Sequence, residues 1–211
     1  MKHTRLAFDT RQAVRHLRRV DSRLASHITR VGPLRMDLRP AGSVFEALLR
    51  AITYQQLSGK AAATIHGRLL DLFPEGLAPD RLLSMPETVL RGAGLSRNKL
   101  LAIRDLAERT LDGSLPDFTV LEKLSDDEVI ERLTVVRGIG RWSVEMLLIF
   151  TLGRPDVLPV DDLGIRKGFQ RIYAMKRLPA AITVQRAARV WAPFRTAASW
   201  YLWRATDTLT A

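Results

Sequence analysis

VVRGIGRWSVEMLLIF (135–150) and the adjoining TLGRPDVLPVDDLGIRKGF (151–169) carry the signals that decide the fold. The first stretch has the pattern of a helix, a tight Gly138-Ile139-Gly140 turn and a second, apolar helix. The second stretch is an irregular Gly/Pro loop that ends in two adjacent carboxylates, Asp161 and Asp162. Two neighbouring negative charges are unfavourable unless a positive group or a function compensates them.

Helical periodicity extends outward from these stretches in both directions. Apolar residues recur at helical spacing along most of the chain, and no convincing alternating strand pattern is present. Ser43 with Glu46, and Ser125 with Glu128, match the capping-box pattern that opens a helix. The sequence therefore predicts an all-α chain of about ten short helices.

The charge balance points to an anionic partner. Among 211 residues, 33 Lys and Arg stand against 22 Asp and Glu, which gives a formal net charge of +11. Such an excess is typical of nucleic-acid binding, and less often of a membrane surface or of a basic exterior without a specific partner. The chain has no cysteine, which excludes disulfides, thiolate catalysis and iron–sulfur clusters. Its four histidines show no metal-ligand spacing, no apolar run has the length of a membrane span, and a cytoplasmic protein is predicted.

The glycine turn has two interpretations. Glycines leave backbone N–H groups uncovered at the start of the next helix, where the helix dipole favours an anion such as phosphate. Arg137 and Arg141 flank the turn and carry the sign of charge that phosphate requires. The alternative is a tight connection between two helices with no ligand.

Several motifs of the chain resemble those of the helix-hairpin-helix (HhH-GPD) DNA glycosylase superfamily, and they occur in the same order along the sequence. Within that superfamily, the chain resembles the DNA-3-methyladenine glycosylase II branch. The hairpin and Asp loop are the most specific of them. The other matching segments are FEALLRAITYQQLSGKAAATI (45–65), GLSRNKLLAIRDLA (94–107) and PFRTAASWYLWR (193–204). The resemblance implies two helical lobes with a cleft between them, one formed by residues 42–154 and the other by 1–41 plus 155–211.

The resemblance assigns the catalytic carboxylate to Asp162, with Asp161 as a neighbour that caps or supports the structure. An N-glycosidic bond breaks through a sugar with oxocarbenium character, which a fixed carboxylate stabilises while it orients water. The alternative from the residues alone is that one Asp merely caps the following helix. Phosphate binding is assigned to Gly138, Ile139, Gly140, Arg141 and Arg137.

A buried target base must be flipped out of the duplex and its place filled. The resemblance places Gln55, Gln56 and Leu57 on the loop that does this, and Gln56 is preferred as the wedge. A solvent-exposed loop is the alternative. A cationic base is attracted to aromatic faces. The resemblance gives Trp142 and Trp203 as pocket walls, to which Tyr54 and Phe45 could add, whereas ordinary core packing is the alternative. Met146 stands where some relatives carry an aromatic residue, which leaves the substrate range open.

The expected activity is that of a monofunctional glycosylase for alkylated bases such as 3-methyladenine and 7-methylguanine. In bifunctional relatives a lysine attacks the sugar, and Trp142 occupies the matching position here. No cofactor or side-chain metal site is expected, although the hairpin backbone could hold Na⁺ or K⁺. The expected partner is double-stranded DNA, with the chain a monomer, in the nucleoid or, in a eukaryote, the nucleus. The rival is a non-catalytic module that recognises distorted DNA with the same hairpin.

Overall fold

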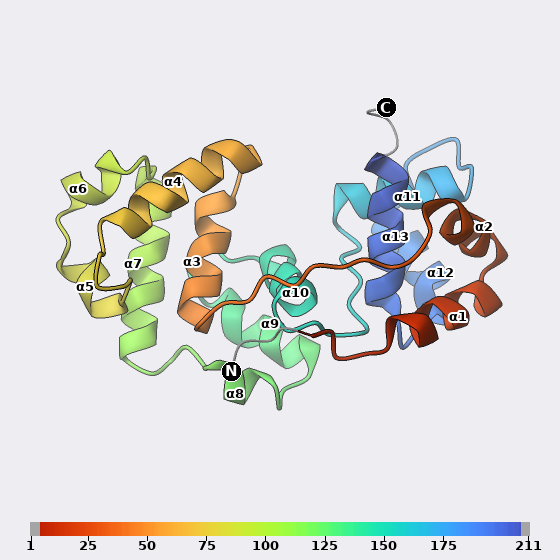
Figure 1. Cartoon of the computed structure of the whole chain (residues 1–211), viewed down its shortest axis with the longest axis horizontal. Helices are drawn as coiled ribbons and strands as arrows, with labels where there is room; N and C mark the ends of the chain where they lie inside the picture. The colour runs from red at the N-terminus through yellow and green to blue at the C-terminus, as the bar shows by residue number, and fades with distance from the viewer. Residues whose placement is uncertain (1–4, 208–211) are drawn as a thin grey trace. The chain divides into compact units, whose positions relative to one another are not determined.

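The computed structural model describes residues 5–207, and this part of the chain consists of helices joined by loops (Figure 1). It contains 13 α-helices and one 3-10 helix, and no strand occurs among the described residues, so the predicted all-α class is confirmed. The prediction of about ten helices was too low, because elements of four to six residues such as α5 and α8 are too short to show a period. In this part of the chain, no helix has the length and apolar character needed to cross a membrane.

The chain splits into two compact units. The first is Pro40–Leu147, and the second combines His3–Arg39 with Leu148–Ala211. The sequence places the second border at residue 154, whereas the structure places it inside helix α10. The reason is that the end of α10 belongs with the N-terminal segment, since the carbonyl of Phe150 accepts a hydrogen bond from the backbone N–H of Arg39 at 2.6 Å.

The first unit holds the helices that surround the predicted hairpin. They are α3 (Val44–Tyr54), α4 (Gly59–Asp71), α5 (Pro79–Ser84), α6 (Glu87–Gly92), α7 (Arg97–Leu111), α8 (Phe118–Leu121), α9 (Asp126–Thr134) and most of α10 (Arg141–Phe150). Helix α7 packs against α3 and α5. Its buried Ile103 and Leu106, with Leu48 and Ile52 of α3, form part of the core of this unit.

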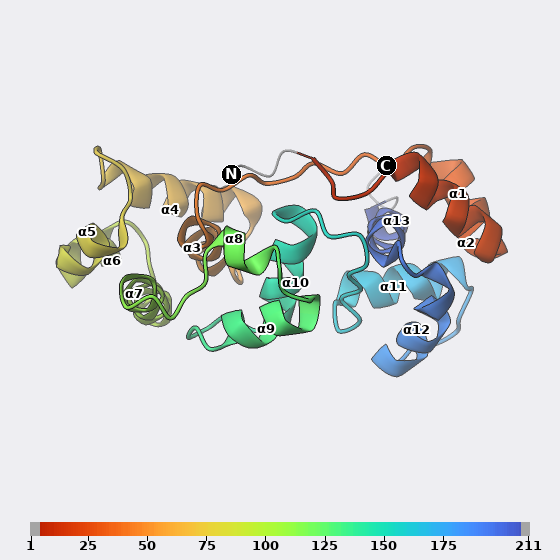
Figure 2. The ribbon, with the colours of Figure 1, turned by 90° about the horizontal axis from the view of Figure 1, so that it is seen from below.

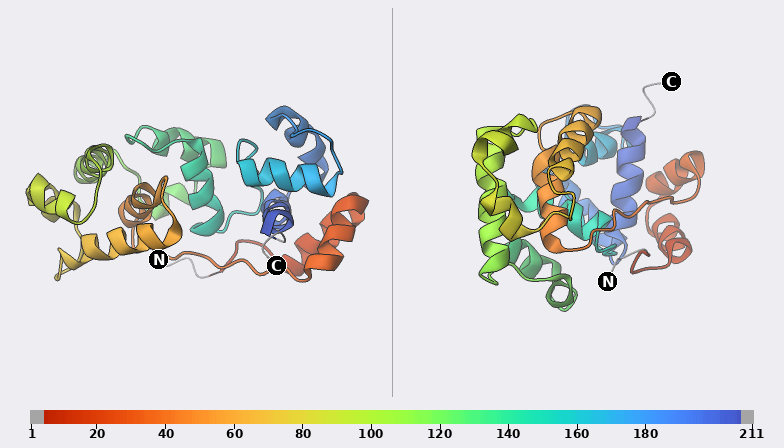
Figure 3. Two further views of the ribbon diagram at one scale, coloured as in Figure 1. Left: turned by 90° about the horizontal axis from the view of Figure 1, so that it is seen from above. Right: turned by 60° about the vertical axis from the view of Figure 1, so that its left-hand side comes forward.

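The second unit is assembled from both ends of the chain. It contains α1 (Thr10–Val20), α2 (Ser22–Val31), α11 (Leu163–Ile172), α12 (Ala181–Ala187), the 3-10 helix η1 (Ala188–Trp191) and α13 (Arg195–Asp207). Figure 2 shows α1 and α2 beside α13, and all three contribute to one apolar core. Helices α11 and α13 cross closely (Figure 3). A Cβ on Gly168 would lie only 2.0 Å from the carbonyl oxygen of Leu202, so glycine is required at this crossing.

Side-chain caps fix where several of the helices begin, among them the two that the sequence predicts. Ser125 and Glu128 form the complete capping box of α9. Ser43 accepts the N–H of Glu46 at 3.1 Å, but the Glu46 carboxylate bonds the N–H of Gly42 at 2.8 Å instead of that of Ser43. Each cap satisfies an N–H that has no partner within its helix, which contributes about 1 kcal/mol.

Candidate functional site

The hairpin is the turn between α9 and α10 in the first unit. Gly138 has a φ of 76°, in the left-handed region that other residues adopt only at a cost. The side chain of Ile139 points into the core and is 4% exposed, while Gly138 and Gly140 lie at the surface. The first N–H groups of α10, which follow directly, have no acceptor inside the helix. The turn therefore combines a buried anchor with a surface of backbone donors.

Asp105 of α7 holds this turn in place, and sequence reasoning did not identify it. Its Oδ2 accepts the backbone N–H of Arg137 at 2.7 Å, and both of its carboxylate oxygens accept from Nε of Arg109 at 3.1 Å. The acceptor and the donor of the Arg137 bond are 32 residues apart in the sequence. Asp105 lies in the segment GLSRNKLLAIRDLA (94–107), where an acidic residue on a helix gives no local sign of such a role. Asp105 acts as a positioning residue for the hairpin.

The two arginines beside the turn differ in their surroundings. Arg141 donates to Glu145 at 3.1 Å and to Asp127 at 3.2 Å. Burial lowers the pKa of Arg141, but the hydrogen bonds and charges of Glu145 and Asp127 outweigh it, so the net pKa is raised. Arg137 is exposed, and the structure records no ion pair for its side chain within residues 5–207. Much of the Arg141 charge is therefore already balanced by carboxylates, whereas the Arg137 charge points to solvent.

The predicted wedge residues have distinct positions on the loop after α3. Gln55 is half-buried, and its Nε2 donates to the carbonyl of Gly138 at 2.9 Å, which ties this loop to the hairpin. Gln56 has a φ of 56° although it is not glycine. Leu57 is 39% exposed. A left-handed non-glycine residue stores strain that is commonly found at functional sites. Gln56 and Leu57 are therefore the exposed members of the loop, and Gln55 is its brace.

The three aromatic candidates of the first unit are not equivalent. Phe45 is 3% exposed and packs as a core residue of α3. The ring of Tyr54 is covered by the guanidinium of Arg50, 4.2 Å from its centroid, and meets the edge of His66. Trp142, in the first turn of α10, is 47% exposed. Of the three, Trp142 presents the largest aromatic surface for a ligand.

Asp162 lies at the start of α11 in the second unit, where its carboxylate accepts structural hydrogen bonds. Its Oδ1 accepts the N–H of Ile165 at 2.9 Å, which caps the helix, and the indole Nε1–H of Trp203 at 3.0 Å. The sequence reading assigned the cap and the catalytic role to different members of the Asp pair. In the structure the cap belongs to Asp162 itself, while Asp161 is exposed. The carboxylate is thereby fixed by donors from two helices.

A column of side chains supports the indole that contacts Asp162. Phe150 stacks on Trp203 with ring centroids 5.7 Å apart and an interplanar angle of 28°. The guanidinium of Arg39 lies 4.5 Å from the centroid of Phe150. A Cβ on Gly164 would be 2.9 Å from both Asp162 Oδ1 and Trp203 Cδ1, so only glycine leaves room for their contact. Sequence reasoning missed Phe150, Arg39 and Gly164 because their roles arise from packing between distant segments.

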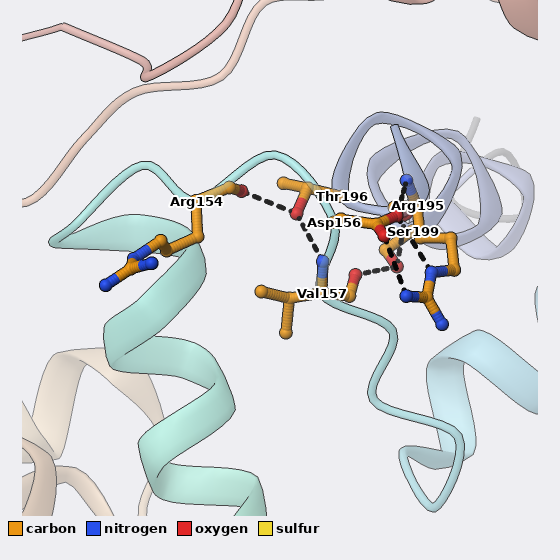
Figure 4. A network of polar contacts seen from close by, with 6 residues as sticks. All are labelled: Arg154, Asp156, Val157, Arg195, Thr196 and Ser199. Carbon is orange, nitrogen blue, oxygen red and sulfur yellow. Dashed lines mark hydrogen bonds and ion pairs between the residues drawn. The ribbon is translucent and has the colours of Figure 1, made fainter. Parts of the chain in front are cut away.

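The loop that leads to Asp162 is anchored on α13 by polar contacts (Figure 4). Arg195 binds Asp156 through two side-chain bonds of 2.8 and 2.7 Å and a backbone N–H bond of 3.0 Å. The Thr196 hydroxyl donates to the carbonyl of Arg154 at 2.7 Å and accepts the N–H of Val157 at 3.0 Å. The Gly/Pro-rich loop, although irregular, therefore has a defined path. In residues 5–207, no group of three or more His, Asp or Glu side chains is arranged to hold a metal ion.

Comparisons with known proteins agree on one family. Residues 49–193 match the model of the HhH-GPD superfamily base excision DNA repair protein. The chain is 43% identical over 162 residues to DNA-3-methyladenine glycosylase 1 of Schizosaccharomyces pombe, covering 76% of this chain and 71% of that protein. It is 32% identical over 202 residues to the alkylbase DNA glycosidase-like protein mag2 of the same organism, covering 93% of each.

A solved structure agrees with these matches. The structure of the Schizosaccharomyces pombe 3-methyladenine DNA glycosylase Mag1 in complex with abasic DNA aligns with a TM-score of 0.82 at 38% identity, covering 94% of this chain and 98% of that one. The family model covers well over half of the sequence, and it spans the hairpin, the anchored loop and Asp162. The chain therefore belongs to the HhH-GPD superfamily of base excision DNA repair proteins.

Proposed function

We propose that this protein is a monofunctional DNA glycosylase that removes alkylated bases, such as 3-methyladenine and 7-methylguanine, from duplex DNA. The observation that carries the proposal is the Asp162 carboxylate, held by Ile165 and Trp203, in a chain of a base excision repair family. The names of its relatives, which refer to 3-methyladenine and to alkylated bases, support this substrate class. Such an enzyme works where DNA is kept, in the nucleoid or the nucleus.

Asp162 supplies the negative charge that the reaction needs. The bond from the sugar C1′ to the base nitrogen breaks with both electrons going to the base, so a cationic 3-methyladenine leaves neutral. The sugar gains oxocarbenium character, which the carboxylate stabilises. A water oxygen then bonds to C1′, and its proton passes to Asp162 or to solvent. Because the substrate base is already cationic, no general acid is needed.

The absence of strand-cleaving activity is part of the proposal. A lyase of this superfamily needs an amine nucleophile in the second hairpin helix, and Trp142 stands at the matching position in the first turn of α10. The half-exposed indole of Trp142 has no nucleophilic amine, but its face suits a cationic base. The indole of Trp203 contributes to the reaction by donating a hydrogen bond that holds the Asp162 carboxylate in place.

DNA is held and opened by the first unit. The donors of the Gly138–Gly140 turn, with Arg137, bind phosphate, while Gln56 or Leu57 enters the gap left by the flipped base. A monovalent cation at the hairpin would be held by backbone carbonyl groups and would add positive charge near the phosphate. The carbonyl of Gly138 accepts from Gln55, but each carbonyl oxygen has a second lone pair. No cofactor is assigned to the bond-breaking step.

Base release from methylated duplex DNA tests the proposal. Asp162→Asn is the matched variant, because an amide oxygen can still accept the bonds of Ile165 and Trp203 while the charge is lost. Wild type should release free base with chelator present, and strands should break only after alkali. The variant should lose release by at least about a hundredfold, as removal of charge stabilisation does in other enzymes.

The outcomes separate the proposal from its rival. Strand cleavage by wild type without alkali would contradict the monofunctional assignment. Equal release by both proteins would remove Asp162 from the mechanism. Tight binding to damaged duplex without release by wild type would favour a non-catalytic module that recognises distorted DNA.

A further inference from the structure

The positive charge of the chain is divided unequally between the two units. Pro40–Leu147, which carries the hairpin, has 13 Lys and Arg against 15 Asp and Glu. His3–Arg39 with Leu148–Ala211 has 19 Lys and Arg against 7 Asp and Glu. The unit with the expected phosphate-binding turn is thus slightly acidic, and the excess charge lies in the other unit. The hairpin alone does not account for the basic character of the protein.

Helix α1 concentrates this charge on one face. Arg11, Arg15, Arg18 and Arg19 follow the i, i+4, i+7, i+8 spacing that places side chains on one side of a helix. All four are exposed, and the structure records no ion pair for any of them within residues 5–207. No acidic residue lies inside α1. We call the exposed side of these four arginines the α1 basic face.

Helix stability does not explain the α1 basic face. Arg18 and Arg19 suit the C-terminal end of the helix dipole, but Arg11 lies in the first turn, at the positive end, and Arg15 lies in the middle of the helix. Like charges three and four residues apart on a helix also destabilise it. The opposite side, with Ala13 and Leu17 at 0% exposure, already packs in the core. The N-cap Asp9 attracts Arg11 and Arg15, but the repulsion among the four arginines remains, and an anion bound to them would relieve it.

We propose that the α1 basic face binds the phosphate backbone of duplex DNA, at a site additional to the hairpin. This inference rests on the proposed function for its choice of DNA. From Arg11 to Arg19 the helix axis advances about 12 Å, and a duplex of that length carries about seven phosphate charges. A membrane surface does not fit, because the apolar side of α1 is buried and cannot insert. An acidic protein fits less well, because the face lacks the aromatic anchors of protein interfaces.

The test compares two variants that lose the same charge. One carries Gln at Arg11, Arg15, Arg18 and Arg19. The control carries Gln at the exposed Lys176, Arg177, Arg186 and Arg189, which belong to the same unit but lie outside α1. Binding to an undamaged duplex is measured by fluorescence anisotropy at several salt concentrations, after circular dichroism and melting have verified folding.

The salt dependence of affinity reports the number of phosphates contacted. Four contacts contribute about −3.6 to the slope of log K against log salt, which is about 150-fold in affinity between roughly 50 and 200 mM salt. The α1 variant should lose a large part of this slope, and the control should keep the wild-type value. An unchanged slope in the α1 variant, or an equal loss in both variants, would overturn the proposal. Binding to an acidic peptide is the remaining comparison. If the α1 variant lost binding to the peptide while its binding to DNA stayed unchanged, the proposal would also be overturned.

Base release by wild type from a duplex with 3-methyladenine is measured separately. If release is absent while the α1 variant still loses its slope, the proposed catalytic function fails and the DNA-binding face remains. If release is normal and the slope is unchanged, the face fails and the catalytic function remains. The two proposals can therefore be judged independently.

Discussion

Trp203→Phe should slow base release, although it leaves an aromatic ring at this position. The substitution keeps a ring that can stack on Phe150 but removes the Nε1–H that donates to Asp162 at 3.0 Å. A hydrogen bond to a charged group is worth about 1.5–3 kcal/mol. If that energy holds the carboxylate in its reactive orientation, its loss lowers the rate by about 10- to 100-fold, at one factor of ten per 1.4 kcal/mol.

The assay is single-turnover release of 3-methyladenine from duplex DNA with protein in excess, so that binding and product release do not limit the rate. Trp200→Phe is the matched control, since it makes the same change in the same helix at a buried tryptophan that does not bond Asp162. The control should lose stability through packing but little of the rate. Melting temperatures of both variants distinguish loss of fold from loss of catalysis.

A double-mutant cycle gives the decisive comparison. If Trp203 acts through the Asp162 carboxylate, Trp203→Phe should cost little further in an Asp162→Asn background, because residues that act as one unit are not additive. An equal loss in both backgrounds would refute the reasoning and would mean that Trp203 contacts the base directly. A wild-type rate for Trp203→Phe would refute it as well.

Three further predictions concern stability, pH and DNA affinity. Gly168→Ala should destabilise the protein by about 3 kcal/mol or more, lowering Tm by about 10 °C, because the added Cβ meets a backbone carbonyl at 2.0 Å. Gly67 is a helical glycine with open space around it, so Gly67→Ala should instead raise the free energy of unfolding by up to about 1 kcal/mol. Equal effects of the two substitutions would contradict this explanation. Burial, aided by a nearby arginine and opposed by a carbonyl hydrogen bond, lowers the pKa of His27 below its ordinary 6.5. The unfolded chain then binds more protons, so stability present above pH 6.5 should fall on acidification; His27→Gln should flatten this dependence in denaturant titrations, and an unchanged profile would count against it. Asp105→Ala should weaken duplex binding by about tenfold in anisotropy titrations, because the backbone N–H of Arg137 in the hairpin loses its charged acceptor. Glu108→Ala, on the same helix, should leave the affinity unchanged. Equal affinities of the two variants would exclude a positioning role for Asp105.

Much of the fold could be predicted because its signals are local. Ser43 and Ser125 each cap the helix that the sequence predicts after them. The break between α1 and α2 is also marked by a local signal, since Asp21 caps α2 by accepting the N–H of Leu24 at 2.9 Å. The weaker predictions were those that required knowledge of what covers a residue. Phe45, offered as a pocket wall, is a core residue.

For the candidate site, the sequence names residues whose roles stay predictions, and it does not give the contacts that hold them in place. Asp162 and the Gly138–Gly140 turn are recognisable in the sequence because the residue types that they require are adjacent to one another. Their supports join positions far apart: Gln55 to Gly138 across 83 residues, and Trp203 to Asp162 across 41. Neither periodicity nor spacing predicts such a pair, because a given donor or acceptor could form its hydrogen bond with many other residues of the chain.

The sequence by itself determined the helical class, the hairpin, the acidic residue at the end of the Gly/Pro loop and the total charge. These follow from local patterns, since helix periodicity, caps and glycine turns act within a few residues. Only the tertiary structure decided that one carboxylate both caps α11 and bonds Trp203, and that Gln55 braces the hairpin. It also assigned the excess charge to the unit that joins both ends of the chain. The physical reason is that packing and hydrogen bonding between distant segments depend on which surfaces the folded chain brings together.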